Sequence, residues 1–400
     1  MTERVPLRAC LFRLDDTEHV LTVVLHHILA DGFSLTPLAR DLAAAYGARL
    51  AGAPPAWPAI DVQYADYALW QRDWLGDTAD PDTPSARQLA YWTETLAGMP
   101  EVLELPTDRP RPDVRSQRGD RVEFEVPADL HERLVRLARE RGVSVFMVMH
   151  AALAAVLSRL GGSDDIAVGT PIAGRGSAAL DDMVGMFVNT LVLRCDVGGC
   201  SFAGLLDRVR DADLGAFMHA DVPFERVVEA VDPPRSTAHS PLFQVLLEFR
   251  TVARPDLELP GLRVRPFERA DEVAAFDLQL SVAEEFDDDG SARGMSGGLV
   301  FATDLFAAET VRRFADRLVR ILRAATESPD TLVADIDVLV PAERASLFPV
   351  RGIPGSRPAP CRICSPRPPH RLRRGRPSGS RASRSPTANS TARRMRWPAA

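Results

Sequence analysis

The chain has 400 residues, 46% of them hydrophobic, which is enough for one large hydrophobic core or two of medium size. It has no run of about 18 apolar residues and no apolar signal segment at its start, which excludes an ordinary membrane span and favours a cytoplasmic protein. Its formal net charge is −7, and its five cysteines are too few and too scattered for a disulfide framework.

The first 50 residues predict a β-hairpin followed by a helix. Two apolar-rich runs, 9–16 and 18–27, meet at the turn "DDT" and read as its strands. Ser34 is placed to cap the helix expected over 35–50, where Pro37 falls in the first turn. The adjacent pair of histidines in "LHHILADGFS" therefore lies in a strand-to-helix loop.

The rest of the chain up to about residue 348 alternates between helical and strand patterns. Further helices are expected at 63–75, 85–98, 128–142, 144–162 with Ser144 as cap, and 311–328. Strands are expected at 120–127, 165–174, 186–197, 242–252, 276–286 and 297–306, with an extended connector at 104–117. This order predicts an α/β fold of mixed sheets with packed helices.

The last 50 residues have a different composition. They contain thirteen arginines and no acidic residue, so the net charge divides into +13 here and −20 in the rest of the chain. The segment lacks apolar periodicity and is expected to be disordered. Because the chain contains no lysine, a GC-rich gene read out of frame explains this tail better than a nucleic-acid-binding arm. Its "CRIC" (Cys361, Cys364) lacks a second pair of zinc ligands.

Several kinds of chemistry have no motif in this sequence. There is no G-x-S-x-G elbow, no P-loop and no G-x-G-x-x-G. A metal site at the histidine pair lacks a third ligand, so no metal is expected. The pair leaves two interpretations: one histidine packs in the core, or His27 faces a cleft with His26 on the opposite, structural side. A neutral His27 could then accept a proton, while Gly32 lets the chain turn tightly after Asp31.

"LHHILADGFS" resembles the His-His-x-x-x-Asp-Gly signature of chloramphenicol-acetyltransferase-like acyltransferases, which include the condensation domains of nonribosomal peptide synthetases. Four further segments resemble condensation-domain motifs in the same order: "YADYALW" (64–70), "VGMFVNTLVLR" (184–194), "HADVPFE" (219–225) and "RSTAHSPL" (235–242). The resemblance covers about residues 5–347. It implies two acetyltransferase-like lobes with a tunnel between them.

The resemblance also implies a division of the chain. Two motifs that open the family's first lobe have no counterpart here, so we expect a partial N-terminal lobe at 1–78, a C-terminal lobe at 79–348, and a tail at 349–400 where a linker to an adenylation domain would stand. Ala220 replaces the glutamine that is usual in the family, which puts one local hydrogen bond in doubt.

The implied reaction is amide formation between a donor acyl or peptidyl thioester and an acceptor aminoacyl thioester. Carrier proteins deliver both on phosphopantetheine arms, so no bound cofactor is expected, and neither nucleic acid nor membrane is an expected partner. By resemblance, His27 has the central role within the site formed by His26, His27, Asp31 and Gly32, either as base or as hydrogen-bond donor. Holding both arms in one tunnel would by itself lower the activation barrier by about 7–11 kcal/mol, because the reacting groups are kept close together.

Two residues of the second lobe, Arg175 and Asn189, are expected to support the site. Asp31 is expected to have a structural role, and Arg175 to bind its carboxylate through two parallel hydrogen bonds. Asn189 either presents its amide to the phosphopantetheine or to the loop, or satisfies local backbone.

Three alternatives remain on the sequence alone. Epimerization domains share the histidine motif, although "FVNTLVLR" and "VPFE" favour condensation. Recruitment domains of the same fold usually lose the motif, which is intact here. The chain could also be an inactive fragment of a broken synthetase gene.

Overall fold

The structure is a computed structural model of the whole chain. The residues it describes are 5–57, 60, 62–250, 257–267, 272–287, 289–339 and 343–344. The chain divides into two units, Met1–Val340 and Pro341–Ala400. Every element below belongs to the first unit, and the predicted tail at 349–400 lies outside the described residues.

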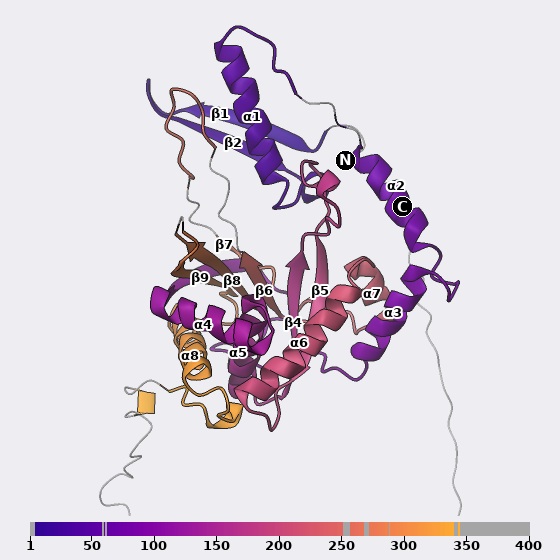
Figure 1. Ribbon diagram of the computed structural model, residues 1–400, viewed down its shortest axis with the longest axis vertical. Helices are drawn as coiled ribbons and strands as arrows, with labels where there is room; N and C mark the ends of the chain where they lie inside the picture. Colours follow the sequence, from indigo (N-terminus) through magenta and orange to yellow (C-terminus); the bar gives the residue numbers. More distant parts are fainter. Residues whose placement is uncertain are drawn as a thin grey trace, which may run out of the picture. The chain divides into compact units, whose positions relative to one another are not determined.

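The elements that the sequence predicted are present in the predicted order, and the structure adds α6, α7 and β7, which were not predicted (Figure 1). The helices are α1 (Leu35–Leu50), α2 (Tyr64–Leu75), α3 (Pro84–Thr95), α4 (Ala128–Arg141), α5 (Val145–Gly161), α6 (Phe202–Met218), α7 (Phe224–Val231) and α8 (Ala308–Glu327), with 3-10 turns η1 (His27–Leu29), η2 (Ala178–Leu180) and η3 (Val333–Asp335). The strands are β1 (Leu7–Arg13), β2 (His19–Leu25), β3 (Arg118–Pro127), β4 (Asp165–Ile172), β5 (Asn189–Asp196), β6 (Val245–Arg250), β7 (Glu272–Val273), β8 (Leu278–Phe286) and β9 (Ala292–Ala302).

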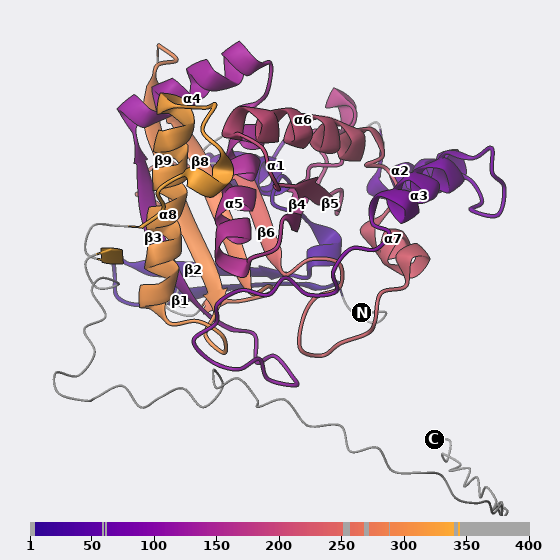
Figure 2. The same ribbon diagram turned by 90° about the horizontal axis from the view of Figure 1, so that it is seen from below.

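Seven strands form one mixed sheet in the order β5-β4-β6-β8-β9-β3-β7. β6 runs parallel to β4 and β8, and the other pairs are antiparallel. Helices α4, α5, α6 and α8 lie along the sheet (Figure 2), and the main hydrophobic cluster is built from these helices and the strands beneath them. The predicted α/β fold is confirmed.

Helix α8 shows how the sequence positions these helices. Its buried side chains, Val311, Phe314, Leu318, Ile321 and Ala325, recur every three or four residues. That spacing places them on one face of a helix, so the face turns to the core and the arginines between them turn outward. By contrast, α5 is buried almost throughout. No single described helix is long and apolar enough to cross a membrane; α4 and α5 reach that length only together, across a bend of 103°.

Strand β9 starts five residues before the predicted strand at 297–306 and ends at Ala302. The sequence "GMSGG" looks like a turn, but its glycines lie within the strand. A Cβ at Gly297 would come within 2.2 Å of the Phe124 ring, and one at Gly298 within 2.5 Å of the Arg121 guanidinium. These glycines are therefore needed because side chains of the paired strand β3 cross over them.

The N-terminal hairpin is present as predicted. β1 and β2 pair antiparallel, with Leu7 opposite Leu25 and Arg13 opposite His19. In the turn, the Asp15 carboxylate accepts hydrogen bonds from the backbone N–H groups of Thr17 and Glu18. This arrangement is the Asx-type turn expected of "DDT".

The hairpin and α1 leave much apolar surface exposed. Every residue of β1 is exposed, and large side chains such as Phe12, Val24 and Leu35 are more than 45% exposed. No residue of β1, β2 or α1 belongs to a hydrophobic cluster of the described residues. The hairpin and α1 are therefore attached to the rest of the unit largely through polar contacts of the histidine loop.

Two predicted helix caps have different outcomes. Ser144 accepts a hydrogen bond from the Met147 N–H and caps α5, as predicted. Ser34 is the residue before α1, but its side chain makes no cap hydrogen bond. The predicted cap is wrong because the hydroxyl is used elsewhere, in the contacts described next.

Candidate active site

The two histidines lie where β2 gives way to η1. His26 accepts a hydrogen bond from the Ile28 N–H at its Nδ1, at 3.2 Å, and so caps this short turn. His27 is the first residue of the turn, and both histidines are exposed. The core-packing interpretation is therefore wrong, and the structural role expected of His26 is a local cap, not burial. His27 keeps an open imidazole.

Asp31 is the buried centre of the loop, with a fully inaccessible side chain. Its Oδ1 accepts hydrogen bonds from the Ser34 N–H at 2.8 Å and the Ser34 hydroxyl at 2.7 Å, and its Oδ2 accepts from the Phe187 N–H at 3.0 Å. Burial raises the pKa of Asp31, but these hydrogen bonds and the Arg175 charge outweigh it and lower the pKa below its ordinary value. Asp31 is ionised and holds the loop in place.

Arg175 is the second charge of the network, and its side chain is 4% exposed. Its Nη2 donates to Asp31 Oδ1 at 3.1 Å, so the predicted ion pair is present. The predicted two-pronged geometry is wrong, because Nη1 donates to the carbonyls of Leu180 and Met183. The guanidinium also lies over the Phe187 ring, 4.2 Å from its centroid.

Ser34 connects these groups, and the sequence did not identify it as a site residue. Its hydroxyl, fully buried, donates toward Asp31 and the Gly185 carbonyl at 2.9 Å. The oxygen accepts from Arg175 Nη2 at 3.0 Å and the Gly185 N–H at 3.1 Å. The only signal in the sequence was its position three residues after Asp31. Ser34 thus ties the histidine loop to the segment 183–187.

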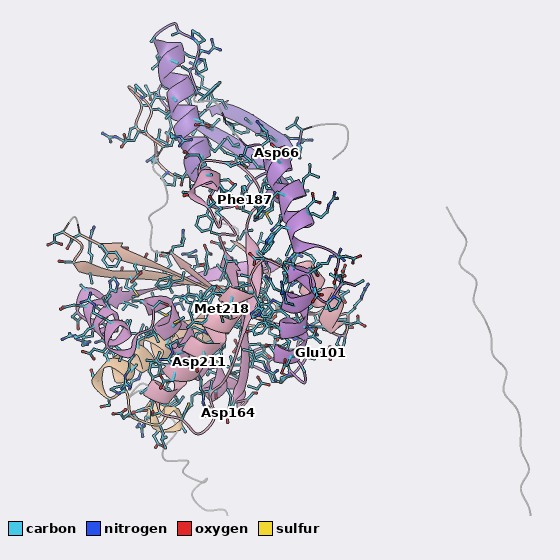
Figure 3. The ribbon with its side chains drawn as sticks, turned by 45° about the vertical axis from the view of Figure 1, so that its right-hand side comes forward. Asp66, Glu101, Asp164, Phe187, Asp211 and Met218 are labelled. Carbon is cyan, nitrogen blue, oxygen red and sulfur yellow. The ribbon has the colours of Figure 1, made fainter. Side chains whose placement is uncertain are left out.

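The motif "YADYALW" packs on the same segment. The Tyr64 hydroxyl donates to the Met186 carbonyl at 2.6 Å, and the rings of Tyr64 and Tyr67 lie 5.2 and 4.7 Å from the Phe187 ring. Phe187 lies beside helix α2 (Figure 3). A Cβ at Gly185 would approach the Tyr64 ring to 2.3 Å, so this position requires glycine. Three of the five motifs therefore meet around Phe187.

Gly32 does not have the backbone conformation that would require glycine after Asp31. It is not among the described residues with positive φ, and a Cβ there would meet nothing within 4 Å. The prediction that glycine is needed for a tight turn after Asp31 is wrong in this conformation.

Asn189 binds backbone on both sides of its amide. Its Nδ2 donates to the carbonyls of Ala220 and Val222, both at 2.8 Å, and its Oδ1 accepts from the Phe224 N–H at 3.0 Å. This is the local-backbone alternative, and a contact with phosphopantetheine stays a prediction. Gln88 accepts from the neighbouring N–H groups of 221 and 222, so the segment 219–225 is held without a glutamine at 220.

The described cysteines, Cys10, Cys195 and Cys200, are free, and no three His, Cys, Asp or Glu side chains of the described residues are grouped as a metal site. Cys361 and Cys364 lie outside the described residues. The chemistry available at the loop is thus that of an exposed imidazole on a rigid, charge-paired support.

The sequence profile of the Condensation domain family matches residues 1–348. The chain belongs to the condensation-domain family. It is 52% identical over 353 residues to a probable non-canonical nonribosomal peptide synthetase, CymA, of Salinispora arenicola, and 48% identical over 341 residues to a dimodular nonribosomal peptide synthase of Bacillus subtilis. These matches cover 88% and 85% of this chain but only 4% and 14% of those proteins.

Among solved structures, this condensation domain is similar to the X-domain from teicoplanin biosynthesis. The TM-score is 0.79 at 36% identity, covering 84% of this chain and 75% of that one. The X-domain has also been solved in complex with OxyB, and that structure has a TM-score of 0.78 to this chain. The resemblance inferred from the five motifs is thereby confirmed at the level of the family.

Proposed function

We propose that this condensation domain forms an amide bond between a donor acyl or peptidyl thioester and an acceptor aminoacyl thioester in nonribosomal peptide synthesis. The observation that carries the proposal is the intact histidine loop, in which an exposed His27 stands on a loop held by the buried Asp31, Ser34 and Arg175. The buried ion pair and the Ser34 hydroxyl fix the loop that presents His27, so the exposed imidazole is held in a defined position.

In the proposed reaction, the α-amine nitrogen of the acceptor attacks the carbonyl carbon of the donor thioester. The carbon–sulfur bond then breaks, the amide forms, and the donor thiol leaves. His27 accepts the proton from the attacking nitrogen and returns it to the departing sulfur, or donates a hydrogen bond to the tetrahedral oxyanion. An amine of pKa about 8 is partly neutral at neutral pH, so a strong base is unnecessary.

The proposed partners follow from the relatives, which are peptide synthetases. We expect donor and acceptor carrier proteins to present the two thioesters on phosphopantetheine arms, and an adenylation domain to stand beside the condensation domain in an intact synthetase. A cytoplasmic location and the division into lobes at residue 78 stay predictions.

The test is to incubate the full chain with one carrier protein bearing a donor aminoacyl thioester and one bearing an acceptor. Intact-protein mass spectrometry should show the dipeptide on the acceptor carrier, and His27→Ala should abolish it. Deuterium uptake at the donor Cα without amide would instead indicate an epimerization-type enzyme. If a correctly folded chain gives neither product, the inactive-fragment alternative stands.

A second candidate function comes from the likeness to the X-domain solved with OxyB. This function would be docking of a partner enzyme without catalysis. The intact His26, His27 and Asp31 favour catalysis, and an Asp31→Asn variant separates the two. A docking role predicts unchanged partner binding and no amide product even in the unaltered chain.

A further inference from the structure

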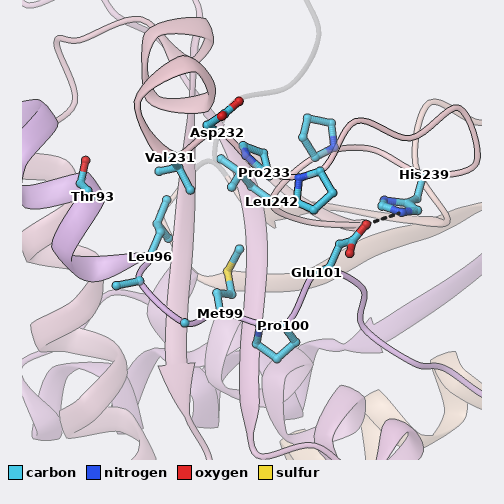
Figure 4. A pocket seen from close by; sticks show the side chains of 14 residues that line it. Thr93, Leu96, Met99, Pro100, Glu101, Val231, Asp232, Pro233, His239 and Leu242 are labelled. Carbon is cyan, nitrogen blue, oxygen red and sulfur yellow. Dashed lines mark ion pairs between the residues drawn. The ribbon is translucent and has the colours of Figure 1, made fainter. Parts of the chain in front are cut away.

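Two features of the fold lie outside the histidine loop and its supporting network. One is a cavity of about 330 Å³ at the ends of α3 and α7 (Figure 4). Its buried titratable side chain, His239, already faces Glu101, with 3.6 Å between Nε2 and Oε1, and none of its lining side chains has a buried polar atom without a partner. The cavity therefore gives no sign of a particular ligand. The other feature is the edge of strand β1.

Strand β1 forms an open edge of the hairpin sheet (Figure 1). It pairs with β2 and with no other described strand, and all seven of its residues are exposed. A two-stranded hairpin is marginally stable by itself, and neither β1 nor β2 contributes to a hydrophobic cluster of the described residues. An open edge of this kind is a template on which a further strand can pair.

The hydrogen bonds of the hairpin fix which backbone groups this edge presents. The His26 N–H donates to the Pro6 carbonyl at 3.0 Å, and the Leu14 N–H donates to the Glu18 carbonyl at 2.9 Å. Hydrogen-bonded and non-hydrogen-bonded pairs alternate along antiparallel strands, so the even-numbered residues of β1 bond to β2. The odd-numbered residues therefore point their N–H and C=O groups away from β2.

Strand β1 is complementary to itself in an antiparallel pairing. The register with complete overlap centres on Cys10 and places Ala9 opposite Leu11 of the other copy. The outward N–H and C=O groups of Ala9 and Leu11, which no described residue uses, then pair in both directions. The same register sets Arg8 opposite Phe12 of the other copy, where a guanidinium and an aromatic ring attract each other.

We propose that two copies of this chain associate through their β1 edges and form one continuous four-stranded antiparallel sheet. Cys10 then faces Cys10 of the other copy in a non-hydrogen-bonded pair, where Cα atoms lie about 4.5 Å apart. A disulfide spans such a distance, and Cys10 is exposed, so a disulfide between copies reports the pairing. The proposal is independent of the condensation reaction, and its test measures association alone.

The first test measures the mass of the full chain by sedimentation equilibrium under reducing conditions. We expect the mass to rise with concentration from that of one chain, 43.7 kDa, toward twice that value. A single-chain mass at every concentration would overturn the proposal.

Mild oxidation with diamide then tests the register. Two Cys10 thiols lose two protons and two electrons, which reduce diamide to its hydrazine, and one sulfur–sulfur bond forms between the copies. Peptide mapping should find this link between two Cys10 peptides. Cys10→Ser should remove the link and leave the mass under reducing conditions unchanged. A dimer in which no Cys10 link forms would refute the register.

Two proline variants distinguish the two edges of the hairpin. Ala9→Pro removes an outward N–H of β1 and no bond to β2, and proline is tolerated where the N–H of an edge strand faces solvent. Val23→Pro is the matched control, because Val23 lies opposite Ala9 and its N–H faces the other edge. Ala9→Pro should weaken dimerisation roughly tenfold or more, since each copy loses one hydrogen bond, and Val23→Pro should not. Equal effects of the two variants would refute the pairing.

Leu11→Lys keeps every backbone group and so separates loss of pairing from loss of folding. Leu11 is 65% exposed, so an ammonium group there stays in water in the single chain. In the paired sheet the two new ammonium groups lie diagonally across from each other and repel. Leu21→Lys is the control, because Leu21 is opposite Leu11 on β2 and 46% exposed. Dimerisation that survives Leu11→Lys unchanged would overturn the proposal, even where Ala9→Pro abolishes it.

Discussion

Replacing Ser34 with alanine tests whether one buried hydroxyl holds the histidine loop to the segment 183–187. The hydroxyl contacts Asp31, Arg175 and both backbone groups of Gly185. After the replacement, Asp31 still accepts from the Ser34 backbone and Arg175, and the Gly185 carbonyl still accepts from the Asp31 N–H. The Gly185 N–H alone would lose its acceptor.

The free-energy cost of Ser34→Ala follows from the hydrogen bonds that are lost. A buried donor left without a partner costs about 1–3 kcal/mol, and a lost hydrogen bond to a charged group about 1.5–3 kcal/mol. Because Asp31 keeps other donors, we expect a total near the lower end, about 2–4 kcal/mol. The hairpin and α1 contribute no residue to a hydrophobic cluster, so this energy appears mainly as local opening of the loop.

Native-state hydrogen exchange measures that opening directly. In Ser34→Ala, the backbone N–H groups of Gly185 and Phe187, which donate to Ser34 and Asp31, should exchange at least tenfold faster. The proposed condensation reaction should also become slower. Ser158→Ala is the matched control, because its buried hydroxyl donates to Asp164 at 3.0 Å outside this network. Unchanged exchange at Gly185 and Phe187 in Ser34→Ala would refute the reasoning.

His27→Ala should abolish amide formation with a melting temperature within about 1 °C of the unaltered chain, whereas His26→Ala should cost about 0.5–2 kcal/mol as a lost cap; the reverse pattern would show that the roles are exchanged. Arg175→Lys should lower both stability and activity, because the three donors on one lysine nitrogen cannot serve Asp31, Ser34 and two carbonyls together; unchanged melting and activity would rule this out. His150 and Asp213 form a fully buried pair at 2.9 Å, and although burial lowers the pKa of His150, the Asp213 charge and hydrogen bond raise it to about 10. The pair's stabilisation is then complete below pH about 6.5 and is lost as the pH rises through about 10; urea unfolding of His150→Gln should lack this alkaline decline, and an equal decline in both proteins would count against it.

Local patterns in the sequence determined the elements and the family. The hairpin turn at Asp15, the Ser144 cap and the three-to-four spacing of α8 depend on residues close together in the chain, so each could be predicted without the fold. The order of five motifs was sufficient to identify a condensation domain.

The tertiary structure alone decided how the site is held. In the sequence, Ser34 lies 151 residues from Gly185, and Asp31 lies 156 residues from Phe187, whose N–H donates a hydrogen bond to the Asp31 carboxylate. A serine before a helix has a good local partner in that helix, so local reasoning predicted a cap. The buried charge of Asp31 offers a stronger hydrogen bond, because charge-assisted bonds gain strength where water is excluded. Which partner prevails depends on the segment that folding brings alongside, and neighbouring residues do not encode it.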